Sequence, residues 1–259
     1  MATVARPAHP LLEARGISKA FGKVQALVSV DFRVGYQEVV GLVGDNGAGK
    51  STLIKIITGV HPPDSGQLFF EGRPAHLASP KEARALGIET VYQDLALVEQ
   101  MSIARNFFLG NEPIRRVGPL SLLDGATMHR RTEQALREIG ITTLRSASQD
   151  VGVLSGGERQ AIAIGRTMHF GAKLIILDEP TSALSIKETR KVLDYVGQAK
   201  RRGLSVIFIT HNLYHVYPVS DRIVVLDHGR KIGDFARDAV SIDDLISLIT
   251  LQREPAREA

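Results

Sequence analysis

The sequence predicts an α/β protein with a mostly parallel sheet, an antiparallel β subdomain at the N-terminus and a helical subdomain. Residues 28–34 alternate apolar and polar side chains, as a half-buried antiparallel strand does. Apolar runs over 38–43, 174–177 and 205–209 are short and rich in β-branched residues. Such runs are typical of strands buried on both faces of a parallel sheet. Helical patterns lie between them, which completes the α/β prediction.

Capping residues set the limits of the predicted helices. Ser79-Pro80-Lys81-Glu82 has the spacing of a capping box with proline at the first helical position, and Gly87 ends that helix. Apolar spacing over 124–140 predicts a further helix that a glycine closes. Ser185-Ile186-Lys187-Glu188 is another capping box, and it opens a helix that we expect to reach Arg201.

The C-terminal part carries a predicted hairpin over 222–235 and an amphipathic segment over 242–249. We expect no regulatory domain and no internal repeat. The whole chain, 1–259, is therefore predicted to be one domain. Its predicted parts are a core of 1–93 and 166–235, a helical subdomain of 94–165, and a C-terminal helix and tail of 236–259.

Composition excludes several classes of function. The net charge of +4 is mildly basic and scattered, so nucleic acid is not an expected partner. The chain has no cysteine, which excludes disulfides and thiolate chemistry. No apolar run approaches the roughly 20 residues that span a bilayer, and the opening residues do not read as a signal peptide. Any membrane role is therefore expected to come from a partner.

A phosphate-binding loop is the first functional motif. Gly44-Asp45-Asn46-Gly47-Ala48-Gly49-Lys50-Ser51 fits G-x-x-x-x-G-K-[ST] between a predicted strand and a helix over 51–57. Its glycines let backbone N–H groups turn toward a phosphate chain, and the helix N-terminus favours an anion. Lys50 is expected to reach the β- and γ-phosphates, and the Ser51 hydroxyl to bind Mg²⁺. The alternative, a glycine-rich turn with a chance lysine, is disfavoured by this setting. The predicted fold is thus a P-loop NTPase core, whose nucleotide contacts are Gly44, Asp45, Asn46, Gly47, Ala48, Gly49, Lys50, Ser51 and Thr52.

Two adjacent carboxylates follow the apolar run at 174–177. Asp178 and Glu179 are expected at the carboxyl end of a buried strand, where open α/β sheets bind ligands. Asp178 is predicted to hold Mg²⁺ through water, and Glu179 to polarise the attacking water as a general base. The alternative is an ordinary strand that ends in a solvated acidic turn.

A second candidate anion site lies at 154–160, where Leu-Ser-Gly-Gly-Glu-Arg-Gln precedes an apolar helix over 161–168. One short chain rarely needs two phosphate cradles, so Ser155, Gly156 and Gly157 are expected to face the ATP of a partner. With this string the chain resembles the ATP-binding cassette (ABC) family, whose signature is LSGGxRQ. The resemblance covers nearly the whole chain, and the motifs fall in the family's order.

The resemblance implies roles for three further residues. Gln93 matches the glutamine that contacts Mg²⁺ or the attacking water and also the transporter. His211, directly after the run at 205–209, matches the histidine that touches the γ-phosphate. Phe21 matches the aromatic residue that stacks on adenine. Taken alone, each could be an ordinary surface, capping or core residue. His215 and His228 match no motif and are expected to be structural.

One position departs from the family pattern. The family usually has aspartate after Asp-Glu-Pro-Thr-Ser-Ala-Leu, and here that position is Ser185. Serine keeps the helix cap and loses the charge, so a cross-interface role of that charge is in doubt. Since aspartate caps about as well as serine, Ser185→Asp is expected to leave stability nearly unchanged.

The segments 92–98 and 102–110 resemble bacterial importers of simple sugars of the ribose, xylose and fructose type, and a single cassette is as in the fructose-type members. This implies ATP and Mg²⁺ as cofactors, a homodimer of cassettes, an integral membrane permease and, indirectly, a periplasmic sugar-binding protein. The implied location is peripheral, on the cytoplasmic face of the inner membrane. The apolar, aromatic stretch over 95–109 is expected to be exposed and to dock on the permease.

Other functions remain as alternatives. One is import of a non-sugar small solute, and another is a soluble ABC ATPase of the iron–sulfur assembly type. A ribosome-acting factor is disfavoured, because it would have two cassettes and a charged linker, and neither is found in this sequence. A small GTPase or P-loop kinase is disfavoured, since there is no Asn-Lys-x-Asp motif.

Overall fold

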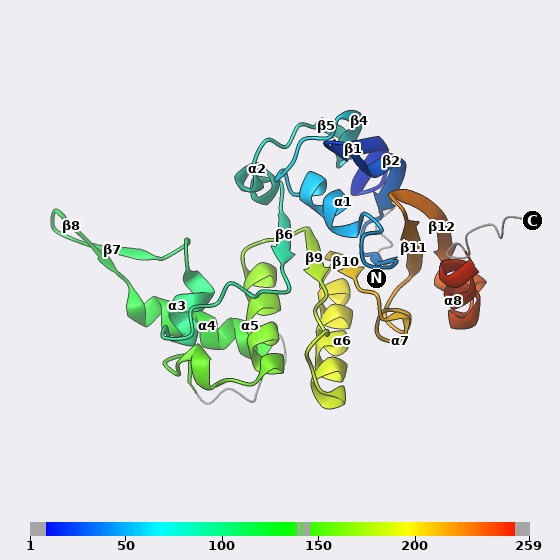
Figure 1. The fold of residues 1–259 in the computed structure, drawn as a ribbon. Helices are drawn as coiled ribbons and strands as arrows, with labels where there is room; N and C mark the ends of the chain where they lie inside the picture. The colour runs from blue at the N-terminus through cyan, green and yellow to red at the C-terminus, as the bar shows by residue number, and fades with distance from the viewer. Residues whose placement is uncertain (1–8, 139–140, 142–145, 252–259) are drawn as a thin grey trace, which may run out of the picture.

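The computed structural model describes residues 9–138, 141 and 146–251 (Figure 1). Its central sheet has six strands in the order β12-β11-β3-β10-β9-β6. All neighbours are parallel except β11 and β12. The strands are β3 (Val39–Val43), β6 (Ile88–Val91), β9 (Leu174–Asp178), β10 (Ser205–Ile209), β11 (Arg222–Asp227) and β12 (Arg230–Ala236). Every residue of β3 and β10 is buried, which confirms the predicted parallel core.

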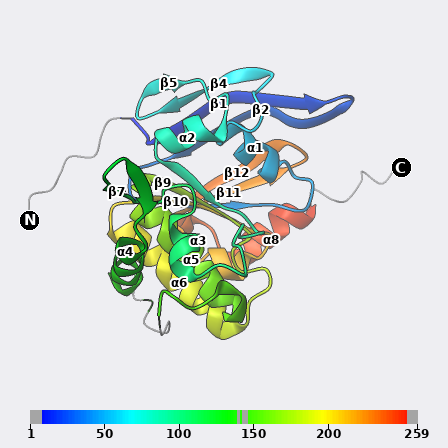
Figure 2. The same cartoon turned by 90° about the vertical axis from the view of Figure 1, so that its left-hand side faces the viewer.

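A second sheet of four antiparallel strands has the order β2-β1-β4-β5. It lies at the top of both views (Figures 1 and 2). The strands are β1 (Leu12–Phe21), β2 (Val24–Val34), β4 (Ser65–Phe70) and β5 (Arg73–Ala75). In β2 the side chains of Val30, Phe32 and Val34 are buried and those between them are exposed, so the predicted alternation is confirmed.

The alternating sides of the central strands face two apolar cores. Val40 and Leu42 of β3 pack with α1 (Lys50–Ile57) and the antiparallel sheet. Val39 and Val43 pack in the other core, with α5 (Gly156–His169) and α6 (Ile186–Arg201). Helix α1 therefore lies between the sheets, and it begins where β3 delivers the phosphate-binding loop. The remaining helices are α2 (Pro80–Ala85), α3 (Ile103–Phe108), α4 (Gly125–Glu138), α7 (Leu213–Val216) and α8 (Ile242–Leu251), with 3-10 turns at Val151–Val153 and Arg237–Ala239.

Of the two capping boxes predicted from the sequence, the one at Ser185 is formed and the one at Ser79 is formed only in part. The Ser185 box is complete, with both reciprocal bonds formed. At α2 the Ser79 side chain accepts from the Glu82 amide, but the Glu82 carboxylate accepts from Ala78 N at 2.8 Å. Glu82 thus reaches one residue further back than a capping box requires. The predicted closing glycine of α4, at position 140, lies outside the described residues.

In the apolar stretch at 95–109 the buried residues lie within 103–108, so the predicted exposure is wrong there, whereas Val98 is 38% exposed. Ile103 and Phe107 are fully buried, and Phe108 is 2% exposed. Leu97 is only partly buried and packs against the same core. Buried Asn106 fixes the preceding loop, because its side chain bonds to both the N–H and the carbonyl of Val98, at 2.7 and 2.9 Å. The apolar residues were recognised, but periodicity did not show that α3 turns them inward.

A two-stranded hairpin, β7 (Ile114–Val117) with β8 (Leu120–Leu123), was not predicted from the sequence. It projects from the helical part of the molecule (Figure 1). All of β8 is exposed, so no buried face marks it as a strand. Across the residues that the structure places, no helix is long and apolar enough to cross a membrane.

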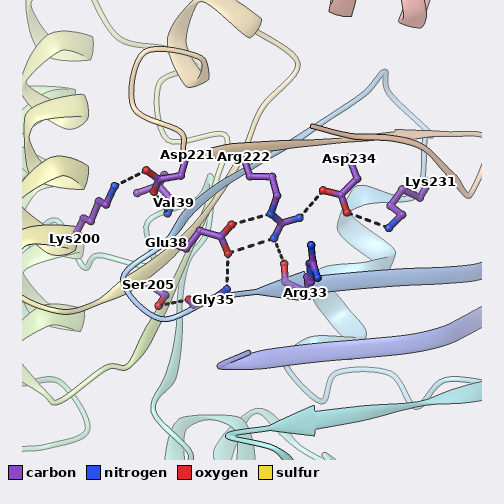
Figure 3. Close-up of polar contacts among 10 residues, drawn as sticks. All are labelled: Arg33, Gly35, Glu38, Val39, Lys200, Ser205, Asp221, Arg222, Lys231 and Asp234. Atoms are coloured by element: carbon purple, nitrogen blue, oxygen red, sulfur yellow. Dashed lines mark hydrogen bonds and ion pairs between the residues drawn. The ribbon is translucent and has the colours of Figure 1, made fainter. Parts of the chain in front are cut away.

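A part-buried ion-pair network joins the two sheets at the end of the central sheet where the parallel strands begin (Figure 3). Arg222, at the start of β11, donates to Glu38 Oε1 at 2.8 Å and to Asp234 Oδ1 at 2.7 Å. It also donates to the carbonyl of Arg33 in β2. Burial raises the pKa of Asp234, but the hydrogen bonds and charges of Arg222 and Lys231 outweigh this, so its pKa is lowered.

We expect Arg222→Ala to lower the free energy of unfolding by about 3–5 kcal/mol, because it leaves the part-buried Glu38 without its cation and Asp234 with Lys231 alone. Asp234 makes the stability that the network contributes depend on pH. Its folded pKa lies below the unfolded value of about 3.9, so its contribution is present above that pH and is lost as pH falls through the folded pKa. Urea unfolding at pH 7 and at a series of values below pH 4 measures both effects. Arg15→Ala, which breaks the exposed Arg15–Glu13 pair, is the control and should change little. Equal effects of the two variants would contradict a structural role for the network.

Candidate active site

The phosphate-binding loop leaves β3 in a conformation that requires glycine. Gly44 has φ +144°, and an added Cβ would lie 2.1 Å from the carbonyl oxygen of Leu226. Gly49 has φ +102°, and a Cβ there would lie 2.7 Å from the carbonyl oxygen of Ala26. These close approaches explain why the loop cannot carry side chains at those positions. Along the loop and the first turn of α1, Asn46, Gly47 and Ser51 are exposed, Asp45, Gly49 and Thr52 are intermediate, and Gly44, Ala48 and Lys50 are buried.

Lys50 is held above the loop by backbone carbonyls. Its Nζ donates to Gly44 O at 2.7 Å and to Asp45 O at 2.9 Å. Burial lowers the pKa of Lys50, while the nearby charges of Glu179 and Asp178 act in the opposite direction. The lysine is therefore a desolvated cation close to the paired carboxylates, a place where a phosphate chain gains strong electrostatic contacts.

The paired carboxylates lie at the carboxyl end of β9, beside β10. Burial raises the pKa of Asp178, the adjacent Glu179 raises it further, and the charges of Lys50 and Lys55 oppose both. Glu179 has φ +47°, a left-handed conformation that is uncommon outside glycine. Such strain persists only where the surroundings fix it. Here the Glu179 amide donates to Ile209 O at 3.0 Å.

Glu179 and His211 are in direct contact. Glu179 Oε1 accepts from the His211 amide at 3.1 Å and lies 2.8 Å from His211 Nδ1. Glu179 Oε2 accepts from the Thr210 hydroxyl at 2.9 Å. The side chain of His211 is 59% exposed, so the far side of the ring is open to solvent. Sequence reasoning missed Thr210, although its place directly before His211 was a usable signal.

Gln93 and Phe21 lie at two other borders of this region. Val91 of β6 pairs with Leu177 of β9. Gln93 lies two residues after Val91, and Glu179 two residues after Leu177, so both lie at the carboxyl end of the parallel strands. Gln93 is exposed. Phe21 ends β1, is 46% exposed and meets His61 edge-on at 5.3 Å between ring centroids. An exposed aromatic ring can stack on a base.

The signature segment contacts a different element, the start of α6. Ser155 caps α5 in a complete capping box with Glu158. The amide of Gly157 donates to Glu188 Oε1 at 3.1 Å. Glu188 was seen in the sequence only as a capping residue, and no local pattern showed this second contact. His215, with Nδ1 3.0 Å from the Thr181 hydroxyl, is part of a local polar network.

The surroundings of Ser185 change the expectation for Ser185→Asp. Ser185 Oγ donates to Glu188 Oε2 at 2.7 Å, and an aspartate could not donate there. We now expect Ser185→Asp to be less stable than wild type and to raise the pKa of Glu188 above its present value of about 2. Ser185→Ala should cost about 0.5–2 kcal/mol through loss of the cap. Thermal unfolding and NMR titration of the carboxyl group measure the two effects. Ser79→Asp is the matched control, since Glu82 bonds elsewhere; equal results at both sites would refute the charge argument.

A parallel sheet with a phosphate-binding loop before α1 and two carboxylates at the end of the strand β9 has the architecture of a P-loop NTPase. Comparison with known proteins narrows this class. The family model described as ABC transporter matches residues 27–182. The fructose import ATP-binding protein FrcA of Rhizobium meliloti is 44% identical over 255 residues, covering 97% of this chain and 98% of that protein. The xylose/arabinose import ATP-binding protein XylG of Sulfolobus acidocaldarius is 45% identical, covering 93% of this chain and 94% of that protein.

The fold is also that of solved ATP-binding cassettes. A solved ATP-binding cassette of an ABC transporter superposes with a TM-score of 0.81 at 23% identity, covering 96% of this chain and 100% of that one. The chain belongs to the ABC transporter family. It is an ATP-binding cassette that hydrolyses ATP, as the sequence predicted.

Proposed function

We propose that this cassette powers the import of a simple sugar, as one of two identical ATPase subunits attached to a membrane permease. The observation that carries the proposal is the likeness over almost the whole chain to two proteins named for sugar import. These relatives favour sugar over a non-sugar solute, and a transporter over a soluble iron–sulfur assembly ATPase. A periplasmic sugar-binding protein would deliver the sugar, and the cassette would lie on the cytoplasmic face of the membrane.

The nucleotide would be held by one chain at its adenine and phosphate ends. Phe21 would stack on adenine, since its ring is exposed at the end of β1. The amides of residues 44–52 and the Lys50 ammonium would bind the phosphates. Lys50 would exchange its two loop carbonyls for phosphate oxygens, which are stronger acceptors.

Mg²⁺ fits the oxygen donors that this edge of the sheet presents. The Ser51 hydroxyl, the Asp178 carboxylate and the Gln93 side-chain amide are the donors that would hold it, directly or through water. When bound, the cation would neutralise phosphate charge during phosphoryl transfer. Its charge would also oppose the burial that raises the pKa of Asp178 and so keep this carboxylate ionised.

Glu179 would act as the general base on the attacking water, and His211 would orient it and contact the γ-phosphate. The support is geometric: the His211 amide and the Thr210 hydroxyl hold the Glu179 carboxylate at the carboxyl end of β9. A base held by such bonds needs no reorganisation when the water arrives.

Each site would be completed by Ser155, Gly156 and Gly157 of the other chain. Their position at the N-terminus of α5, a 14-residue helix, favours an anion. Within this chain the same segment contacts α6 instead. A homodimer would place two such cradles over two phosphate-binding loops.

The permease would dock in a hollow of about 250 Å³ between the end of β6 and α5. Tyr92 and Leu97 line it on one side and Arg166 and Phe170 on the other. Arg166 is fixed by a bond to Leu109 O at 2.8 Å. The hollow directly follows the segment that carries Gln93. Because Glu89 and Asp94 also line it, a short cytoplasmic segment of the permease with both apolar and polar side chains would fill it.

The chain has no native cysteine, so single-cysteine crosslinking tests the transporter assignment cleanly. Tyr92→Cys, in membranes of cells that express the chain, should crosslink to a multi-spanning protein. Val24→Cys, 67% exposed on β2, is the control and should not. Uptake of labelled fructose, xylose and ribose then identifies the sugar. Crosslinks to soluble proteins alone would contradict the proposal.

A further inference from the structure

The carboxylate of Glu188 lies in what we call the signature cradle, the segment Ser155–Gly157. Oε1 accepts from the Gly157 amide at 3.1 Å. Oε2 accepts from the Ser185 hydroxyl at 2.7 Å and from the Ser185 amide at 3.1 Å. Donors from two separate loops therefore converge on one side chain.

Gly157 and Glu188 are packed closely as well as hydrogen-bonded. A Cβ added to Gly157 would lie 2.7 Å from Glu188 Cγ. Hydrogen bonds, first from the Ser185 hydroxyl and then from the Gly157 amide, hold the pKa of Glu188 at about 2. The side chain is thus a full negative charge throughout the physiological range of pH.

We propose that Glu188 is an internal anion that occupies the signature cradle and that the γ-phosphate of the partner's ATP must displace. The inference rests on the proposed shared site. A phosphate oxygen entering the cradle would use the Gly157 amide, the donor that Glu188 now uses, together with the Ser155 hydroxyl. Two anions cannot share the Gly157 amide without strong repulsion. Glu188 therefore sets the ATP concentration at which two cassettes close on nucleotide.

Displacement of Glu188 also changes the loop that precedes α6. When the carboxylate leaves the cradle, its bonds to Ser185 are strained or broken, because one carboxylate bridges both segments. Phosphate binding at one segment is thereby transmitted to the other. Serine at position 185 suits this arrangement, because its hydroxyl can donate to the carboxylate, whereas an aspartate could not.

Glu188→Gln and Glu188→Ala test the proposal through dimerisation of the purified chain. Sedimentation would be followed against the concentration of the Mg²⁺ complex of the β,γ-imido analogue of ATP, which is not hydrolysed. Both variants should reach half-maximal dimer at a concentration about threefold or more below that of wild type, the order expected for removing one like charge at a partly solvated site. The difference should shrink at high salt.

The controls separate this effect from helix capping and from the shared site itself. Glu82→Ala removes the carboxylate that bonds to Ala78 N ahead of α2 and should leave the half-maximal concentration unchanged. A merely structural role of Glu188 predicts weaker dimerisation in the alanine variant, so an unchanged or raised concentration in both Glu188 variants would overturn the inference. If wild type itself does not dimerise with nucleotide, the shared site fails, and the Glu188 inference fails with it. If wild type dimerises with nucleotide but the Glu188 variants do so at the same concentration, the Glu188 inference is rejected and the shared site stands.

Discussion

Glu179→Gln is expected to bind MgATP and to hydrolyse it at least about a hundredfold more slowly than wild type, because a positioned general base commonly contributes 10²–10⁴ in rate. Glutamine has nearly the same shape: its side-chain oxygen can accept from the His211 amide, and its NH₂ group can donate to the Thr210 hydroxyl in place of the bond that Glu179 Oε2 accepts. It can also adopt the left-handed backbone at about the same cost, so the local fold should survive. Steady-state phosphate release and equilibrium binding of a fluorescent ATP analogue measure the two properties separately.

Lys50→Ala is the matched comparison within the same site. It removes the desolvated cation above the loop and should weaken nucleotide binding, whereas Glu179→Gln should not. The pair therefore separates phosphate binding from the chemical step. Near-normal turnover by Glu179→Gln would reject Glu179 as the base and leave His211, whose Nδ1 lies 2.8 Å away, as the next candidate.

Local sequence patterns predicted the parts of this fold whose causes are local. The runs at 174–177 and 205–209 are buried strands because continuous apolar, β-branched residues fit a sheet covered on both faces. The phosphate-binding loop could be located because glycine is the residue that tolerates the close backbone approach at Gly44. Ser185 and Glu188 form the predicted capping box because that motif depends on residues three apart.

Contacts between distant segments could not be predicted in this way. Arg222 bonds to Glu38 across 184 positions, and Gly157 to Glu188 across 31. Neither pair has a local signature, since pairing of such residues depends on how whole elements pack. The β7–β8 hairpin was missed for another reason, because the exposed strand β8 lacks the buried face that alternation reveals. The apolar composition of 95–109 suits either a core or a surface. The packing of α3 places the apolar residues of 103–108 in the core.

A mixture of two inactive variants is expected to recover activity if each ATP site is built from both chains. Lys50→Ala damages the phosphate-binding loop, and Ser155→Arg fills the signature cradle. Each homodimer would then carry a lesion in both of its sites and should retain about 1% of wild-type turnover or less. In a heterodimer the two lesions fall in one site, and the other site is intact.

The size of the recovery follows from random pairing. Equal amounts of the two chains give heterodimers in about half of all dimers, each with one intact site of two, so about a quarter of wild-type activity returns if the sites act independently.

Ser155 also caps α5, so Ser155→Arg could fail by unfolding that helix. Ser155→Asp is the second variant, because aspartate keeps the cap and places a negative charge against the phosphate. Circular dichroism would verify that both variants are folded. Full activity in either homodimer would show that one chain forms a complete site by itself. No recovery from a mixture whose heterodimers are seen by sedimentation would show that both sites must be intact. Recovery with either Ser155 variant would place the signature segment of one chain over the ATP of the other.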